Sequence, residues 1–210
     1  MTRRICSVLC AASFFSTATL VQYAVAQTSK EWAQCAGREG PILDLVIQGC
    51  TAVIQAGQDP PTKLAAAFNN RGVAYRYKRE YDRALQDYDQ AIRLNPNDAS
   101  HYNNRGIIYR IKGEYDRAIS DYDEAIWLKS DYPAAFYNRA IAYTEKGEYD
   151  NALANFDMVL RFDAKNAFAL YGRGMARLKK GERETASIDI AAAKAIDPNI
   201  AEEFETAGLR

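Results

Sequence analysis

The chain has 210 residues and is balanced in charge, with 27 basic and 27 acidic side chains and a formal net charge of zero at pH 7. Proteins that bind nucleic acid usually carry a basic excess for the phosphates, so we expect no nucleic-acid partner. The length is ample for several packed helical units.

Residues 1–26 have the pattern of a signal peptide. Arg3 and Arg4 precede a long apolar stretch, and residues 24–26 read Ala-Val-Ala, which fits a cleavage site with small residues. We therefore expect cleavage after residue 26, a mature chain that is periplasmic or secreted, and no stable membrane span after cleavage. The alternative is an uncleaved membrane anchor, which the Ser and Thr residues between positions 13 and 19 disfavour.

Residues 27–62 are predicted to form a divergent N-terminal hairpin of two helices, at 29–37 and 42–55. Two of the four cysteines lie in the signal peptide, and the other two, Cys35 and Cys50, fall one in each helix. In an oxidising compartment this pair favours a disulfide, which we expect to stabilise the hairpin by roughly 3 kcal/mol. A redox-active pair is the alternative, which the absence of a C-x-x-C spacing disfavours.

From residue 65 onward, two short sequence motifs recur every 34 residues. Motifs related to Asn-Arg-Gly start at positions 70, 104, 138 and 172, and motifs related to Glu-Tyr-Asp start at positions 80, 114, 148 and 182. A fixed period in this range is typical of stacked helical hairpins, because one hairpin cannot bury its apolar face alone. Each period therefore predicts a helix, a turn, a second helix and a second turn.

Small residues inside the predicted helices indicate close packing. Gly72 and Gly106 occupy helix interiors, where Gly costs up to about 1 kcal/mol relative to Ala. We expect them where the two helices of one hairpin cross. The large complementary pieces are the aromatic side chains of Tyr75, Tyr109, Tyr143, Tyr88, Tyr122 and Phe156. Ala140 occupies the equivalent position of the third period, so a methyl group is tolerated there.

The repeated pattern resembles the tetratricopeptide repeat family. The signature residues of the first period are Phe68, Gly72, Tyr75, Ala84, Tyr88, Ala91 and Pro96. The later periods match less closely, as expected toward a terminal repeat with one face near water. The resemblance implies an all-α fold, an α-solenoid of stacked helix-turn-helix repeats. It places a closing helix at 199–210 after four repeats within 65–198, which are assigned to 65–98, 99–132, 133–166 and 167–200.

The resemblance also implies a binding surface, because the first helices of such repeats line the concave wall of a superhelix. Asn recurs at the sixth position of three repeats and would bind the main chain of an extended peptide, similar to the asparagine ladder of the O-linked N-acetylglucosamine transferase family. The alternative is that these carboxamides bond within the wall. The candidate peptide-binding residues are Asn70, Asn104, Asn138, Asn69, Asn103, Val73, Ile107, Tyr137, Tyr171, Arg76 and Arg110.

Arginine recurs at the seventh position of each repeat, where the family more often has Leu. We expect these arginines to lie at the hairpin interface and to form structural ion pairs with the second helices, in preference to binding a ligand. The arginines and their candidate partners are Arg71, Arg105, Arg139, Arg173, Asp87, Asp89, Asp121, Asp123 and Asp157. The family's carboxylate clamp for acidic C-termini is not expected, because this chain has only Asn104 of the residues that it requires.

Nothing in the sequence indicates catalysis. The only histidine, His101, has no nucleophile or metal-ligand spacing around it, and there is no Gly-rich phosphate loop. We therefore expect no catalytic residue, no metal and no cofactor. The favoured function is an exported, bacterial-type adaptor that binds a peptide or protein partner in the concave groove. The alternative is an envelope scaffold, or an accessory subunit of a secretion or cell-wall complex, that uses outer surfaces; an enzyme is the third interpretation.

Overall fold

The computed structural model describes residues 30–36 and 43–206. The predicted signal peptide and the last four residues of the predicted closing helix, 207–210, lie outside the described residues. Residues 30–35 are helical. The helices that follow are α2 (Leu43–Ala56), α3 (Pro61–Tyr77), α4 (Tyr81–Leu94), α5 (Ala99–Ile111), α6 (Tyr115–Leu128), α7 (Pro133–Lys146), α8 (Tyr149–Phe162), α9 (Ala167–Lys180), α10 (Arg183–Ile196) and α11 (Ile200–Thr206).

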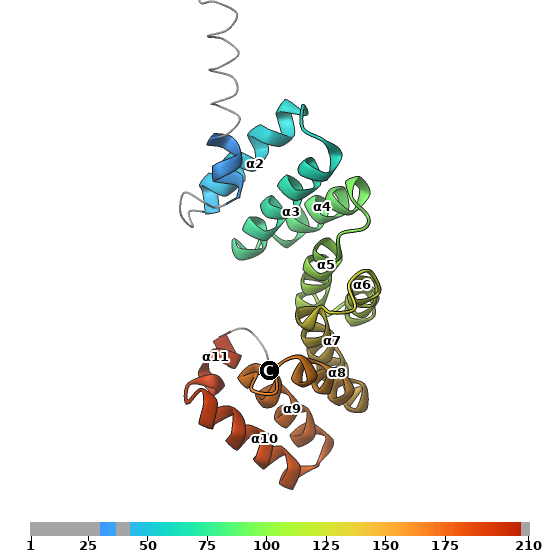
Figure 1. Cartoon of the computed structure of the whole chain (residues 1–210), viewed down its shortest axis with the longest axis vertical. Coiled ribbons are helices and arrows are strands. Elements are labelled where there is room, and N and C mark those ends of the chain that lie inside the picture. The colour runs from blue at the N-terminus through green and yellow to red at the C-terminus, as the bar shows by residue number, and fades with distance from the viewer. Residues whose placement is uncertain (1–29, 37–42, 207–210) are drawn as a thin grey trace, which may run out of the picture.

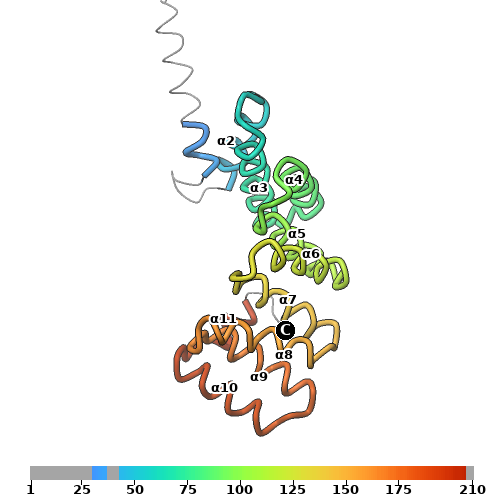
Figure 2. The backbone as a smooth tube through the Cα atoms, turned by 45° about the vertical axis from the view of Figure 1, so that its right-hand side comes forward, coloured from blue at the N-terminus to red at the C-terminus, as the bar shows by residue number. Residues whose placement is uncertain are grey.

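The helices stack as antiparallel pairs in a curved array (Figure 1). Within the array, α3 pairs with α4, α5 with α6, α7 with α8, and α9 with α10. Each first helix also contacts the first helix of the next pair, so these helices follow the inner side of the curve. The turned view shows the same stack running from α3 to α10 (Figure 2). The predicted all-α fold of stacked helix pairs is confirmed.

The turn within each pair contains one residue with a left-handed backbone. Gly113, Gly147 and Gly181 have φ angles of 77°, 88° and 95°, and Arg79 takes 61° at the equivalent place in the first pair. Such angles favour glycine, because a Cβ atom crowds the neighbouring backbone. This residue ends the first helix and reverses the chain, so that the second helix starts two residues later.

The helices of the first two pairs cross closely at a glycine. A Cβ atom placed on Gly72 would lie 2.7 Å from Cε1 of Tyr88, and one on Gly106 would lie 2.7 Å from Cε1 of Tyr122. These distances are shorter than normal carbon contacts, so only glycine fits without displacing the ring. The close crossing expected from the sequence is confirmed.

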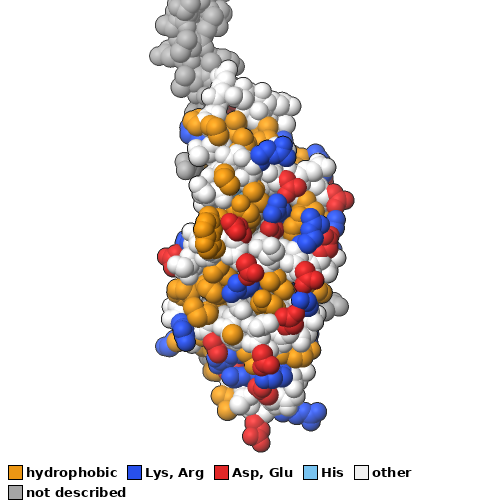
Figure 3. All heavy atoms as spheres, turned by 90° about the vertical axis from the view of Figure 1, so that its right-hand side faces the viewer, with side chains coloured by type: hydrophobic (Ala, Val, Ile, Leu, Met, Phe, Trp, Pro, Cys, Tyr) orange, Lys and Arg blue, Asp and Glu red, His pale blue; other side chains and the backbone are white. Residues whose placement is uncertain are grey.

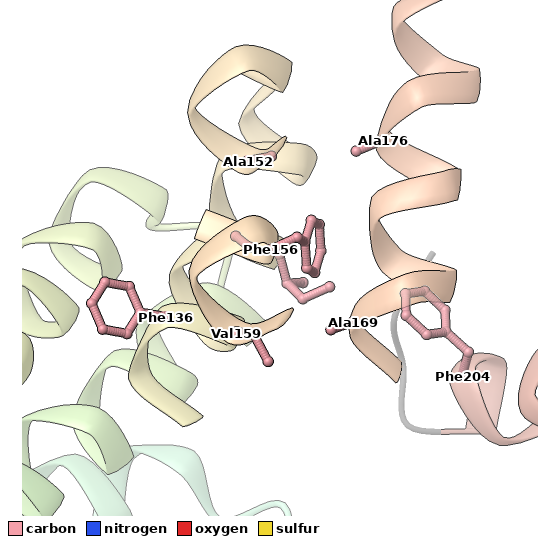
Figure 4. Close-up of a cluster of buried hydrophobic side chains, with 9 residues drawn as sticks. Phe136, Ala152, Phe156, Val159, Ala169, Ala176 and Phe204 are labelled. Atoms are coloured by element: carbon pink, nitrogen blue, oxygen red, sulfur yellow. The ribbon is translucent and has the colours of Figure 1, made fainter. Parts of the chain in front are cut away.

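The third pair has Phe156 as its aromatic ring and Ala140 in place of the glycine, and both are buried in one cluster. The ring of Phe156 points from α8 toward α9 (Figure 4). A Cβ atom on Gly172 of α9 would lie 2.7 Å from Cε1 of this ring, so Gly172 leaves space for the ring between α8 and α9. Phe204 of α11 lies against the same part of α9, with its ring centroid 5.0 Å from that of Tyr171. The final helix thereby covers the apolar end of the stack.

The recurring arginines join successive repeats. Arg105 donates through Nε and Nη2 to Asp121 of its own repeat, at 2.9 and 2.7 Å, and through Nη1 to Asp89 of the preceding repeat at 2.7 Å. Arg173 contacts two aspartates in the same arrangement. The predicted structural ion pairs are confirmed. On the side of the molecule that Figure 3 shows, acidic and basic side chains are interspersed, without a large patch of one sign.

The disulfide predicted between Cys35 and Cys50 is present. It joins the helical residues 30–35 to α2, with the two Cα atoms 4.5 Å apart, and both cysteines are buried. Val53 and Ala67 pack against them and complete a small separate core. The disulfide therefore fastens the start of the array to α3 through both covalent and apolar contacts.

Candidate peptide-binding groove

The candidate residues form stripes on the first helices. On α3, Asn69, Val73 and Arg76 follow each other at spacings of four and three residues, which places them on one face of the helix. The same stripe recurs on α5 one repeat later. On α7 and α9, Tyr137 and Tyr171 take the place of its first asparagine. Because these helices are neighbours along the inner side of the array, the stripes combine into one wall.

Four of the asparagines form hydrogen bonds across the wall. Asn104 Nδ2 donates to Asn69 Oδ1 at 2.9 Å, and Asn138 Nδ2 donates to Asn103 Oδ1 at 2.9 Å. We call these two bonds the carboxamide ladder. They are the bonds of the alternative interpretation, in which carboxamides bond within the wall. A carboxamide has two N–H groups and two acceptor lone pairs, so each bond leaves further groups of Asn104 and Asn138 for a ligand.

The ladder is continued at one end and interrupted at the other. Asn70 Nδ2 donates to the carbonyl oxygen of Cys35 at 3.3 Å, which ties the wall to the N-terminal hairpin. Each of these bonds joins residues 35 positions apart. At the other end, Gly172 follows Tyr137 by 35 positions and has no side chain to donate. The Tyr137 ring packs instead edge-on against Phe156, with centroids 5.9 Å apart.

An apolar cavity lies at each end of the carboxamide ladder. The first, of about 190 Å³, is lined by Asn70 and by the apolar side chains of Leu43, Val46, Val73 and Tyr77, among others. The second, of about 330 Å³, is lined by Asn138 with Pro133, Tyr137, Val159 and Phe168, among others. A row of amide groups between two apolar cavities suits an extended chain that carries apolar side chains along its length.

The apolar candidates differ in how far they belong to the core. Val73 lines the first cavity. Ile107 is partly buried against the core cluster that contains Tyr122. The ring of Tyr171 rests on Phe204 of the final helix. These side chains therefore contribute both to the packing behind the inner wall and to its surface.

The two arginine candidates have different environments. Arg110 is only 9% exposed and donates through Nη1 to Glu145 Oε1 at 2.8 Å, so its charge is already paired. Burial raises the pKa of that carboxyl, and the charge of Arg110 opposes the shift. Arg76 is half-buried and lies over the Tyr77 ring, with its Cζ atom 4.8 Å from the ring centroid. Across the described part of the chain, no carboxylate forms an ion pair with Arg76.

The described residues show no arrangement for metal chemistry. His101 is buried, and its Nε2 atom lies 3.7 Å from a carboxylate oxygen of Asp98. Within residues 30–36 and 43–206, no three side chains of the metal-ligating types are grouped together. In the same ranges, no helix combines the length and the apolar character that crossing a bilayer requires.

Sequence comparison decides the family. Tetratricopeptide repeat profiles match residues 65–98, 87–120 and 134–163, and a TPR repeat profile matches residues 106–145. Residues 65–163 of the chain are tetratricopeptide repeats. Such repeats are protein–protein interaction modules on a scaffold fold that is usually non-catalytic, and they imply protein partners. A search of curated protein sequences found no match.

Several solved structures share the fold. A crystal structure of MamA has 21% sequence identity and a TM-score of 0.68, and the alignment covers 85% of this chain and 96% of that one. YrrB, described as a TPR protein with an unusual peptide-binding site, has 20% identity and a TM-score of 0.67, with 87% and 92% covered. MamA from Desulfovibrio magneticus RS-1 has 13% identity and a TM-score of 0.71, with 82% and 96% covered. At these identities the similarity shows the fold alone.

Proposed function

We propose that this TPR protein is a non-catalytic adaptor that binds an extended peptide, or an extended segment of a partner protein, along its inner wall. The observation that carries the proposal is the carboxamide ladder with an apolar cavity at each end. Carboxamides match the alternating donors and acceptors of a peptide main chain, and the cavities match its side chains. The description of YrrB supports peptide binding as a use of this fold.

The ladder also orients the groups that a peptide would contact. Asn104 and Asn138 are half-buried, and each is bonded to the preceding repeat through one N–H group. This bond fixes the plane of each carboxamide before a ligand arrives. Fixed donors and acceptors lose less conformational entropy on binding than freely rotating side chains, so the bonds within the wall favour ligand binding as well as packing.

The test replaces the sixth-position asparagines together. The ladder variant is Asn70→Ala, Asn104→Ala and Asn138→Ala; the control variant changes exposed asparagines elsewhere, Asn97→Ala, Asn151→Ala and Asn199→Ala. We expect the ladder variant to lose capture of partners from an envelope extract, and short peptides to compete with capture by the unmodified chain. Each lost bond costs about 1 kcal/mol, so circular dichroism must show that both variants stay helical. Equal capture by the two variants would refute the proposal.

The proposal includes export to the cell envelope. The pattern at residues 1–26 and the Cys35–Cys50 disulfide both support an oxidising destination. We expect the protein in an envelope or secreted fraction, with Gln27 as its N-terminal residue by peptide sequencing. Recovery of the full-length chain from the cytoplasm with reduced cysteines would contradict export and leave the groove proposal intact.

A second candidate function uses the outer surfaces. Trp127 on α6 is 76% exposed and Ile188 on α10 is 67% exposed, and large apolar side chains at such exposure favour a protein contact. In this case the chain would be an envelope scaffold, or an accessory subunit of a secretion or cell-wall complex. Trp127→Ala would then abolish capture, and short peptides would not compete.

A further inference from the structure

We propose that Arg76 and the cavity beside it form one subsite that selects an acidic residue and a large apolar residue two positions apart in an extended peptide. The inference rests on the peptide-binding function proposed above and states which peptides the groove prefers. Three observations carry it. Arg76 has no ion-pair partner among residues 30–36 and 43–206, its guanidinium group is partly desolvated, and Tyr77 borders both Arg76 and the cavity.

The missing partner follows from the register of the inner wall. Contacts between successive first helices join residues 35 positions apart, as in Asn69 with Asn104 and Arg110 with Glu145. Arg76 precedes Arg110 by one repeat, and the residue 35 positions after Arg76 is Ile111. Isoleucine cannot neutralise a guanidinium group. The first repeat therefore has an arginine equivalent to Arg110 but no carboxylate equivalent to Glu145.

The environment of Arg76 favours an external carboxylate. In the part of the chain that the structure describes, its Nε atom is buried without a hydrogen-bond partner, as is the Nε atom of Arg110, but the Nη atoms of Arg76 lack the carboxylate that Arg110 has. On α2, the carboxylate of Asp44 is engaged by Lys78 at 2.6 Å. A partly desolvated guanidinium group without a counter-ion is unfavourable, and a carboxylate would supply both the charge and the hydrogen bonds that it lacks. The Nη1–Oε1 contact of 2.8 Å in the Arg110–Glu145 pair is the geometry that a ligand would reproduce.

Tyr77 connects this cation to the apolar cavity. The side chain of Tyr77 is 65% exposed; its ring lies under the Arg76 guanidinium and also lines the cavity. The cavity volume, about 190 Å³, exceeds the roughly 150 Å³ of an engineered cavity that binds benzene, so one large apolar side chain fits. In an extended peptide, residues two positions apart point to the same side and are roughly 7 Å apart. We assign one of two such side chains to Arg76 and the other to the cavity, because Tyr77 borders both.

The experiment selects ligands from a random peptide library on the purified, oxidised chain. We expect enrichment of Asp or Glu two positions from a large apolar residue. Arg76→Gln should lose the acidic preference and keep the apolar one, whereas Arg93→Gln, which removes an exposed charge on α4, should keep both. By fluorescence anisotropy, a selected peptide should bind the unmodified chain about tenfold or more tightly than its Gln analogue, and this ratio should fall to about one in Arg76→Gln.

A second variant tests the register independently. Ile111→Glu places a carboxylate 35 positions after Arg76, where Glu145 stands relative to Arg110. Because Ile111 is 42% exposed, the change is tolerated on the surface. We expect Ile111→Glu to weaken binding of the acidic peptide about tenfold and to leave the Gln analogue unchanged. Ile111→Gln is the matched control and should bind both peptides as the unmodified chain does.

The outcomes separate this inference from the function on which it rests. Enriched peptides without an acidic preference, or an acidic preference that persists in Arg76→Gln, would overturn the subsite and leave the groove intact. An equal loss of acidic-peptide binding in Ile111→Glu and Ile111→Gln would also overturn the subsite. If no peptide is enriched at all, both the proposed function and the subsite are wrong.

Discussion

The crossing of α5 and α6 at Gly106 determines the sign of one mutational effect. In an exposed helix interior, replacing Gly with Ala stabilises a protein by about 1 kcal/mol. At Gly106 the new Cβ atom would lie 2.7 Å from Cε1 and 3.0 Å from Cζ of Tyr122, whose side chain is fully buried. Optimal carbon contacts are about 3.5–4.0 Å, so the ring must retreat by roughly 1 Å. Overpacking of this kind costs about 1–3 kcal/mol, and we expect Gly106→Ala to destabilise the fold by about 1 kcal/mol net.

The steric origin of this effect is tested by removing the ring. Tyr122→Leu destabilises the chain by itself, but it leaves room for a methyl group at Gly106. In that background Gly106→Ala should stabilise by about 1 kcal/mol, because only the gain in helix propensity remains. The predicted coupling between the two substitutions is therefore about 2 kcal/mol. Ala140→Gly is the matched control and should lose about 1 kcal/mol, since Ala140 already carries a methyl group at the equivalent position of α7.

The assay is equilibrium urea unfolding, followed by far-ultraviolet circular dichroism, on the unmodified chain, the two single variants and the double variant. If the single variant Gly106→Ala were more stable than the unmodified chain, the steric argument would be refuted. So would additive effects, meaning a cycle that closes within about 0.5 kcal/mol. Either result would show that the ring and the helix can separate without cost, and that the recurring glycine has another cause.

Three further predictions concern single sites. Arg79→Gly should raise stability by about 1 kcal/mol in urea unfolding, because Arg79 holds a φ angle of 61° where the other turns have glycine; a lower midpoint would contradict this reasoning. Burial lowers the pKa of His101 below its ordinary value of 6.5, so the folded chain binds fewer protons there than the unfolded chain. Stability from this site should therefore decrease as the pH falls below 6.5, and His101→Gln should reduce the difference in urea midpoint between about pH 7.5 and pH 5.5; an unchanged difference would argue against a buried neutral histidine. Reduction of the Cys35–Cys50 disulfide should cost roughly 3 kcal/mol, measured as faster hydrogen exchange in α2 with little change in α9, and uniform acceleration would contradict a local role.

The fold could be predicted because the same packing pattern recurs along the chain, most fully in the first repeat. Gly106 and Tyr122 repeat the relation of Gly72 and Tyr88 at the same separation, so one packing solution is written more than once in the sequence. The ends of the helices were harder to predict than the helices themselves. The family pattern begins at residue 65, but α3 begins at Pro61, because proline fits the first turn of a helix and gives no apolar periodicity.

The candidate site could be predicted in position and not in detail. The repeat period placed the asparagines on one wall, yet the bond of Asn69 with Asn104 depends on a displacement of one residue between neighbouring first helices. A period of 34 residues does not reveal an offset of 35. The same offset pairs Arg110 with Glu145, so one predicted ligand-binding arginine is occupied within the chain. The signal that could have identified these contacts is complementary residue types separated by 35 positions.

This offset also explains why the ladder ends where it does. Asn103 accepts a bond because Asn138 stands 35 positions later, whereas Tyr137 faces Gly172 at the same offset. The glycine leaves space for the Phe156 ring, against which Tyr137 packs. Successive first helices are therefore joined by a pair of amides at one place and by packed aromatic rings at another. A residue on the inner wall is thus constrained by the next repeat before it is available to a ligand. Arg76 is where that constraint is unmet among the described residues, because its register partner is apolar and its charge has no counter-ion, and a ligand carboxylate can supply both the charge and the hydrogen bonds.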